Sequence, residues 1–243
     1  MRLGEVGVTA LEAAKAYGKN PLILLPALIL MVGMFLMGRL SLYVLPFLQT
    51  NAANILWSIL AIVLQLLILA VCFSALLSYA YTVVTSRSKG LSRMFLSVWK
   101  RTGLNFLLLL TTTLTLALLN VLAITVGKYL LAISTTAALG AVMGVWVLGF
   151  VGGVIFLAFA NILCVIHGTG FWTSIRESAH LVRRNYPFVL FISLLFFALI
   201  YMFDRFLPDL LAELIKTLVL LPYLSLFLVF FLKKIKNYDL STR

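Results

Sequence analysis

Charged residues are scarce in this sequence of 243 residues. They make up 11% of the chain and hydrophobic residues 63%, whereas soluble proteins average about 25% charged and about 45–50% apolar residues. So few charged side chains cannot cover the surface of a soluble domain, and the mean hydropathy is +1.14. The composition therefore excludes a water-soluble globular protein and predicts a single integral membrane domain over residues 1–243.

Cysteine and histidine are also rare, with two residues of each. Cys72 and Cys164 lie within apolar stretches and offer no disulfide framework, so we interpret them as small packing residues. Cys164 and His167 are three positions apart and would share one side of a helix. A metal site normally needs three or four ligands, and we expect Cys72 and His180 to lie at other depths. We therefore predict no metal and no cofactor.

The apolar stretches contain almost no ionisable residues. Only Glu213 and Lys216 enter one, three positions apart, and we interpret them as a surface pair near its outer end. The alternative is a gating or substrate contact. The lack of a carboxylate deep in a span argues against a proton-driven transporter and an intramembrane aspartyl protease. The sequence has no H-E-x-x-H, G-x-S-x-G or Walker motif. We assign no catalytic residue and expect that the chain is not an enzyme.

Six apolar stretches are long enough to cross a membrane, which takes about 20 residues in a helix. The predicted spans cover about residues 21–38, 55–85, 104–127, 137–166, 187–203 and 210–232. A seventh span within residues 129–166 would place the two basic loops on opposite sides of the membrane. We therefore interpret residues 129–136 as an outer interfacial segment before the fourth span. The predicted fold is an all-α bundle of six transmembrane helices.

Lysine and arginine outnumber acidic residues by 19 to 7, and they gather in the loops after the second and fourth spans. Because basic loops stay in the cytoplasm, this pattern places both termini there, in a multi-pass protein of the plasma membrane. Topology thus explains the net charge of +12, and we expect no nucleic-acid partner. The candidate residues for binding anionic lipid headgroups or a protein partner are Arg93, Lys100, Arg101, Arg176, Arg183 and Arg184.

Two of the polar segments that precede spans have the same spacing of residues. Thr9 and Asn20 precede the first span, and Ser174 and Asn185 precede the fifth, eleven positions apart in both cases. Each segment begins with an S/T-x-x-E pattern, which is typical of a helix capping box. We therefore expect a short helix and an asparagine elbow before each of these spans.

The segment before the third span matches this arrangement in part. It keeps Lys100 and Asn105 at the matching positions but has Met94 in place of the capping residue. We predict three repeats of an interfacial amphipathic helix followed by a membrane hairpin, and the alternative is that these short polar matches arise by chance. The third such helix would have two faces, made of Phe171, Ile175, Ser178 and Val182, and of Arg176, His180, Arg183 and Arg184.

A resemblance follows from residues 174–187, which read Ser-Ile-Arg-Glu-Ser-Ala-His-Leu-Val-Arg-Arg-Asn-Tyr-Pro and open into Phe188. This stretch resembles the elbow of six-span membrane domains found with glycerophosphodiester phosphodiesterases and in their stand-alone relatives. About 20 residues carry the resemblance. Since this chain has no soluble phosphodiesterase domain, the resemblance implies the six-span fold and no activity.

Glycines distinguish the fourth span. Gly140 and Gly144 form one small-xxx-small pair, and Gly149 and Gly153 form a second that points to nearly the opposite side. We expect this helix to pack against neighbours on both sides, at the centre of the bundle. The alternative is a homo-oligomer formed through one of the pairs.

The remaining features within spans are prolines and uncharged polar residues. Pro26 and Pro222 should each bend a span, and we interpret both bends as packing features. Gln65, Asn120 and Asn161 either form hydrogen bonds between helices or line a polar cavity. Together these features predict a non-catalytic scaffold or accessory subunit that binds lipid or a partner. The alternative is a transporter or channel for a small or amphiphilic solute, which requires that cavity.

Overall fold

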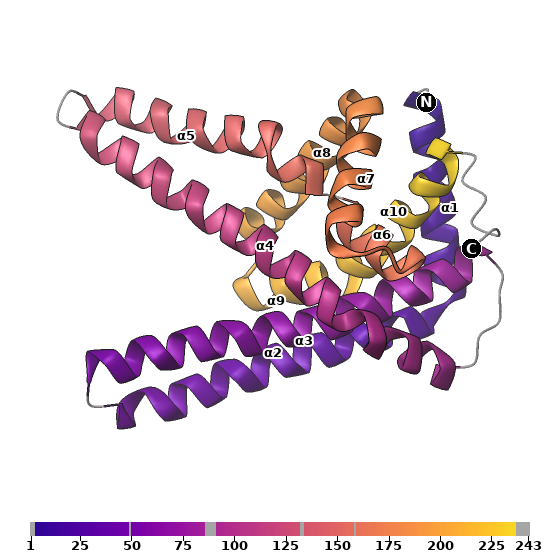
Figure 1. The fold of residues 1–243 in the computed structure, drawn as a ribbon, viewed down its shortest axis with the longest axis horizontal. Helices are drawn as coiled ribbons and strands as arrows, with labels where there is room; N and C mark the ends of the chain where they lie inside the picture. Colours follow the sequence, from indigo (N-terminus) through magenta and orange to yellow (C-terminus); the bar gives the residue numbers. More distant parts are fainter. Residues whose placement is uncertain (1–2, 49, 86–90, 132–133, 158, 237–243) are drawn as a thin grey trace.

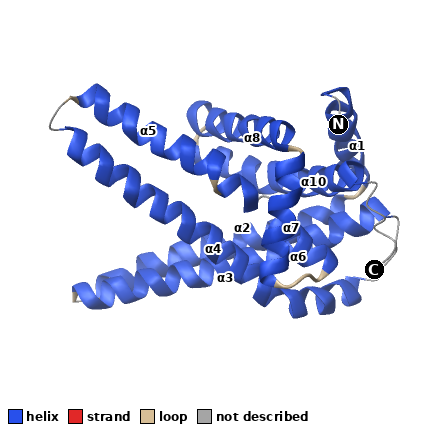
Figure 2. Ribbon diagram, turned by 45° about the horizontal axis from the view of Figure 1, so that its top comes forward, coloured by secondary structure: helices blue, strands red, loops and turns tan. Residues whose placement is uncertain are grey.

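The computed structural model describes residues 3–48, 50–85, 91–131, 134–157 and 159–236. All of its regular elements in these ranges are helices, as Figure 2 shows. The α-helices are α1 (Leu3–Lys19), α2 (Leu24–Val44), α3 (Asn51–Thr85), α4 (Leu91–Leu131), α5 (Thr135–Gly152), α6 (Ala160–His167), α7 (Phe171–Arg184), α8 (Tyr186–Phe206), α9 (Asp209–Ile215) and α10 (Leu221–Lys236). Three 3-10 segments, η1 (Pro21–Ile23), η2 (Leu45–Phe47) and η3 (Val154–Leu157), and one π-helical segment, η4 (Lys216–Leu220), connect or interrupt them.

Six helical segments are long and apolar enough to cross a membrane, which confirms the predicted all-α fold of a membrane protein. They cover Pro21–Phe47, Asn51–Thr85, Arg101–Leu131, Thr135–His167, Tyr186–Phe206 and Asp209–Lys234. Each contains one of the spans predicted from hydropathy. The segment predicted to be interfacial, residues 129–136, contains the end of α4 at Leu131 and the start of α5, and the Ser134 hydroxyl caps α5 by accepting a bond from the Ala137 N–H at 3.0 Å. Its interfacial position stays a prediction.

The helices form three hairpins joined to a compact end (Figure 1). The α2–α3 and α4–α5 hairpins diverge from each other towards their turns, while α1, α6, α7 and α10 gather at the opposite end. The core lies at that end, where Leu76 of α3, Leu163 of α6 and Phe231 of α10 are fully buried in one cluster. The long hairpins expose apolar side chains instead, as lipid-facing helices do.

The fourth span is broken. Helix α5 ends at Gly152, and Gly153, with φ of −132° and ψ of −70°, leads into η3 and then into the short helix α6. The predicted central position of this span is confirmed only for its second half, where α6 packs against α3, α4 and α7 and buries Leu163 in the core, whereas α5 packs along α4 and otherwise meets mainly η3. A Cβ added at Gly140 or Gly144 would meet nothing within 4 Å, so both face away from the rest of the chain.

The close packing of α5 involves a different pair of glycines. A Cβ added to Gly149 would lie 2.2 Å from Leu119 Cδ2 of α4, and one added to Gly127 of α4 would lie 2.6 Å from Val142 Cγ2 of α5. Glycine at these two positions allows the hairpin helices to approach each other closely. Gly149 was among the predicted packing residues, and Gly127 was not.

The sixth span is interrupted as well, by the π-helical η4 just before Pro222. Proline has no N–H, so it leaves the carbonyl four residues earlier, that of Leu218, without its helical donor. The Tyr17 hydroxyl of α1 donates to this carbonyl at 2.9 Å. Burial raises the pKa of the Tyr17 phenol, so the group keeps its proton and stays a donor at neutral pH.

The predicted capping boxes are wrong. Thr9 lies within α1 and Ser174 within α7, and the residue that precedes α7 is Gly170. Both hydroxyls are fully buried. Because the helix already extends before each residue, the hydroxyl bonds elsewhere: Thr9 donates to the Glu5 carbonyl four residues back at 2.7 Å, and Ser174 lies 2.6 Å from the Thr169 hydroxyl.

The asparagine elbows occur at two of the three predicted positions. The side-chain amides of Asn20 and Asn185 each donate to the carbonyl four residues back, at 2.8 and 3.1 Å, where one helix ends and the next begins. The elbow at Asn105 is wrong, since α4 runs through it without a break. Asn105 is buried and donates to the Ala70 carbonyl and the Ser74 hydroxyl of α3. The threefold repeat stays a prediction.

Candidate functional site

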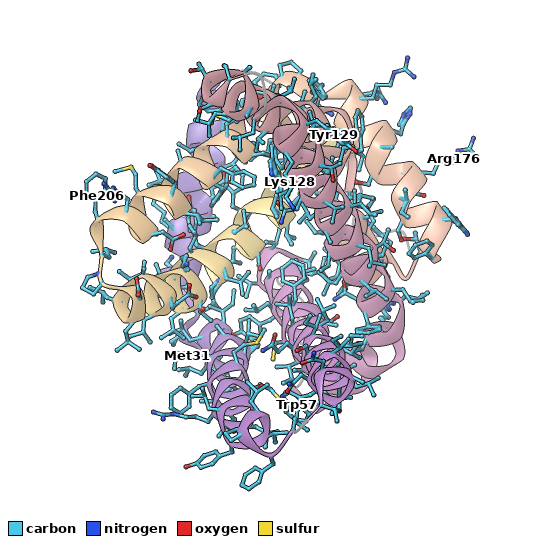
Figure 3. The ribbon with its side chains drawn as sticks, turned by 90° about the vertical axis from the view of Figure 1, so that its left-hand side faces the viewer. Met31, Trp57, Lys128, Tyr129, Arg176 and Phe206 are labelled. Carbon is cyan, nitrogen blue, oxygen red and sulfur yellow. The ribbon has the colours of Figure 1, made fainter. Side chains whose placement is uncertain are left out.

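Helix α7 has a buried side and a charged side. Ser178 and Val182 are fully buried against η3 and α6, whereas Arg176, Arg183 and Arg184 are exposed. The side chain of Arg176 points away from the bundle in Figure 3. Three cationic side chains within nine residues of one helix therefore face outward, at positions where an anionic group can reach them.

A groove of about 1010 Å³ runs along this charged side. It is lined by Phe156, Trp172, Thr173, Arg176, Glu177, Ala179, His180, Leu181 and Arg183. The indole of Trp172 is 78% exposed. The groove thus offers guanidinium, hydroxyl and imidazole donors beside an aromatic ring, with one carboxylate among them. This combination suits a phosphate headgroup attached to an apolar tail, because guanidinium pairs with phosphate and tryptophan favours the membrane interface.

The candidate basic residues do not form one site. Arg176 and Arg183 line the groove, and Arg184 is exposed on the same helix. Arg93 and Lys100 lie in the first turns of α4, and their side chains fall outside the described residues.

Arg101, predicted to bind lipid or a partner, has one guanidinium nitrogen bonded within the fold, and its lipid-binding role stays a prediction. Its Nη1 atom donates to the Val165 carbonyl and, at 3.1 Å, to the Ile166 carbonyl, both in the last turn of α6. The last carbonyls of a helix have no intrahelical donor, and a cation there also interacts favourably with the helix dipole. Gly168 ends α6 with φ of 65°, and a Cβ there would lie 3.1 Å from Nη2 of Arg101. Arg101 therefore caps α6.

Two further side chains satisfy the backbone where the fourth span is broken. The Ser178 hydroxyl of α7 donates to the Phe156 carbonyl at 2.6 Å and accepts from the Phe159 N–H at 3.1 Å. The Tyr186 hydroxyl donates to the Val151 carbonyl at 2.9 Å. From the sequence, Ser178 was predicted only to share a helix face with Phe171, Ile175 and Val182. Gly153 could have indicated its role, because a glycine can break a membrane helix, and a broken helix within a membrane needs polar partners nearby.

The proposed polar cavity residues lie on three different helices. Asn120 is exposed on α4, Gln65 is half-buried on α3, and Asn161 is half-buried on α6. The Oδ1 atoms of Asn161 and Asn105 are buried without a hydrogen-bond partner. Neither groove is lined by Gln65, Asn120 or Asn161.

The described residues hold no group of three or more histidine, cysteine, aspartate or glutamate side chains that could bind a metal ion. Cys164 is fully buried at the contact of α4 with α6.

Comparison of the chain with protein-family models, with curated proteins and with solved structures finds no match. The resemblance to the six-span domain of glycerophosphodiester phosphodiesterases therefore stays a prediction.

Proposed function

We propose that this chain is a non-catalytic membrane protein whose basic inner-face helices bind anionic lipid headgroups, and that it acts as a scaffold or accessory subunit. In this proposal both termini lie in the cytoplasm and the protein belongs to the plasma membrane. The observation that carries the proposal is the charged side of α7, where Arg176 and Arg183 line a groove beside the exposed Trp172. Each basic residue near an anionic leaflet contributes about 1 kcal/mol of attraction.

The position of the charged side relative to the chain ends supports the inner-face assignment. Helix α1 and the end of α10 lie away from the turns of the two long hairpins (Figure 1). The ion pair between Lys234 and Glu12, at 2.9 Å, holds these two helices together. The Tyr223 hydroxyl of α10 also donates to the Ala10 carbonyl at 3.2 Å. The compact end therefore carries α1, α7 and the end of α10 together, away from the turns of the two long hairpins.

The transporter hypothesis has less support. It requires the amides of Gln65, Asn120 and Asn161 to surround one polar cavity, and Asn120 is exposed on α4 instead. A side chain on the lipid-facing surface of a hairpin cannot line a solute pathway through the same chain. The exposed arginines of α7 remain unexplained in that hypothesis.

Replacing Arg176, Arg183 and Arg184 together by glutamine should lower the affinity for phosphatidylglycerol about 100-fold, because three cationic contacts of about 1 kcal/mol each are lost. Native mass spectrometry of the purified full chain, titrated with phosphatidylglycerol or phosphatidylcholine, measures this affinity. The control variant replaces Arg39 and Arg205, two exposed arginines near hairpin turns, by glutamine. Unchanged phosphatidylglycerol binding in the triple variant, or an equal loss in the control, would contradict lipid binding at α7.

The scaffold role is tested separately, by affinity purification of the tagged chain from native membranes in lipid particles. We expect a stoichiometric protein partner that the triple arginine variant retains less well. Recovery of the bare chain alone would count against a scaffold or accessory role while leaving the lipid site intact.

A further inference from the structure

A second groove lies between two membrane helices, away from α7. It encloses about 540 Å³ between α2 and the α9–η4 segment. Met31, Met34 and Phe35 of α2 line one wall, and Leu210 and Leu214 of α9 line the other. This volume is within the range of about 300–1,000 Å³ that small-molecule sites occupy, and methionine side chains adapt to flexible apolar ligands.

Two polar side chains, Glu213 and Thr217, also line this apolar groove. The Glu213 side chain is 69% exposed and belongs to a small charged network. In that network Lys216 Nζ lies 2.7 Å from Asp204 Oδ1 and 2.5 Å from Glu213 Oε1. The two carboxylates already hold one ammonium group of the protein itself, and one negative charge remains uncompensated among the three side chains.

Glu213 lies within a candidate membrane span, one helical turn after its start at Asp209, and the α2 residues that line the groove are in the middle of the candidate span Pro21–Phe47. In Figure 1 the turn between α8 and α9 lies well short of the turns of the two long hairpins. Figure 3 shows Phe206 and Met31 on the same side of the molecule. An uncompensated carboxylate within a candidate membrane span is costly in hydrocarbon and is typical of a functional site.

We propose that this groove binds a single-chain amphiphile with a cationic amine headgroup. The headgroup pairs with the exposed side of the Glu213 carboxylate, and the alkyl chain lies among Met31, Met34 and Phe35. Charge complementarity selects this occupant, because the headgroup supplies the missing positive charge and the groove walls are otherwise apolar. This site is independent of the anionic-lipid site proposed on α7.

The test uses the full chain in nanodiscs of phosphatidylcholine and a chain-labelled hexadecyltrimethylammonium spin probe. Electron paramagnetic resonance measures the fraction of probe that the protein immobilises, and hexadecyl sulfate with the same label is the matched probe of opposite charge. We expect the cationic probe to bind about fivefold more tightly than the sulfate. Glu213→Gln should abolish this preference, whereas Asp209→Asn, on a residue of the same helix that does not line the groove, should retain it.

A second variant, Met34→Trp, fills the groove and should lower the immobilised fraction of the cationic probe without changing Lys216, Asp204 or Glu213. The thermal unfolding of each variant is measured in parallel, so that a loss of fold is distinguished from a loss of binding. Equal immobilisation of the two probes by the unaltered protein would show that the groove holds only boundary lipid, and would overturn the proposal. Retention of the preference in a folded Glu213→Gln variant would overturn it as well.

Discussion

Replacing Arg101 by methionine is expected to destabilise α6 by about 3 kcal/mol, because the Val165 and Ile166 carbonyls lose their donor. Hydrogen bonds that involve a charged group contribute about 1.5–3 kcal/mol each, and a buried acceptor left without a donor loses that contribution in full. The effect should be local, since α6 has only eight residues and depends on its neighbours. The fully buried thiol of Cys164 reports the opening of α6. Its reaction with a maleimide should accelerate roughly 100-fold.

Arg183→Met is the matched control for this experiment. It removes an arginine that is exposed on α7, so the reactivity of Cys164 should not change. Cys72 is also buried and is replaced by alanine in both proteins, so that one thiol is measured. An Arg101→Met variant with unchanged Cys164 reactivity but weaker phosphatidylglycerol binding would contradict the capping role, and would favour the lipid-binding role predicted from sequence.

Replacing Gly149 by leucine is expected to destabilise the α4–α5 hairpin by about 3 kcal/mol. A Cβ at this position would overlap Leu119 Cδ2 and lie 3.1 Å from Leu119 Cγ, so a leucine here must displace the Leu119 side chain or move the two helices apart. Overpacking of this kind costs about 1–3 kcal/mol, and we expect a cost near the upper end of this range because a leucine side chain is large. The free energy of unfolding in mixed micelles with increasing dodecyl sulfate measures the loss.

Gly144→Leu on the same helix is the control, because a Cβ there meets nothing within 4 Å. This variant should be neutral or slightly stabilising, since leucine is the better helix former. The same pair of variants also tests the homo-oligomer that the sequence suggested. If Gly144→Leu destabilises the monomer as much as Gly149→Leu, then α5 is central to the bundle and the arrangement described above is wrong.

The hydropathy of the sequence was sufficient to predict the six spans, because each hairpin helix exposes apolar side chains over the length of a membrane. The elbows at Asn20 and Asn185 could be predicted as well, since each precedes or adjoins a proline that favours the start of a helix. Hydropathy does not reveal the break after Gly152, because the residues on both sides of it are equally apolar. The continuity of α4 depends on the contact of Asn105 with α3, which no local pattern encodes.

The candidate binding site was predictable in part. The spacing of Arg176 and Arg183 indicated a charged side of α7, and both residues line the groove. Arg101 could not be separated from them by sequence, because its neighbours in the loop are also basic. Its role depends on α6, a helix about 60 residues away that exists only because the fourth span is broken. The apolar groove beside Glu213 was not predicted, since it forms between α2 and α9, which are far apart in the sequence.

The interruptions of the fourth and sixth spans are stabilised by polar side chains from other helices. Arg101 of α4 and Ser178 of α7 donate to backbone carbonyls of the fourth span, and Tyr17 of α1 donates to a backbone carbonyl of the sixth. Backbone groups freed within a membrane have no water to bond, so such partners are required for the fold. The helices that approach the membrane therefore have a structural role besides any contact with lipid.

A double-mutant cycle between Tyr17 and Pro222 measures how much the Tyr17 hydroxyl stabilises the interrupted sixth span. In the natural chain Tyr17→Phe removes the hydroxyl that donates to the Leu218 carbonyl, and we expect a loss of about 1–2 kcal/mol in the free energy of unfolding. Pro222→Ala restores a backbone N–H that can bond to the same carbonyl. In the Pro222→Ala background Tyr17→Phe should therefore cost less than about 0.5 kcal/mol, giving a coupling energy of about 1 kcal/mol. Equal losses in the two backgrounds would show that Tyr17 does not compensate for the proline, and would contradict the account.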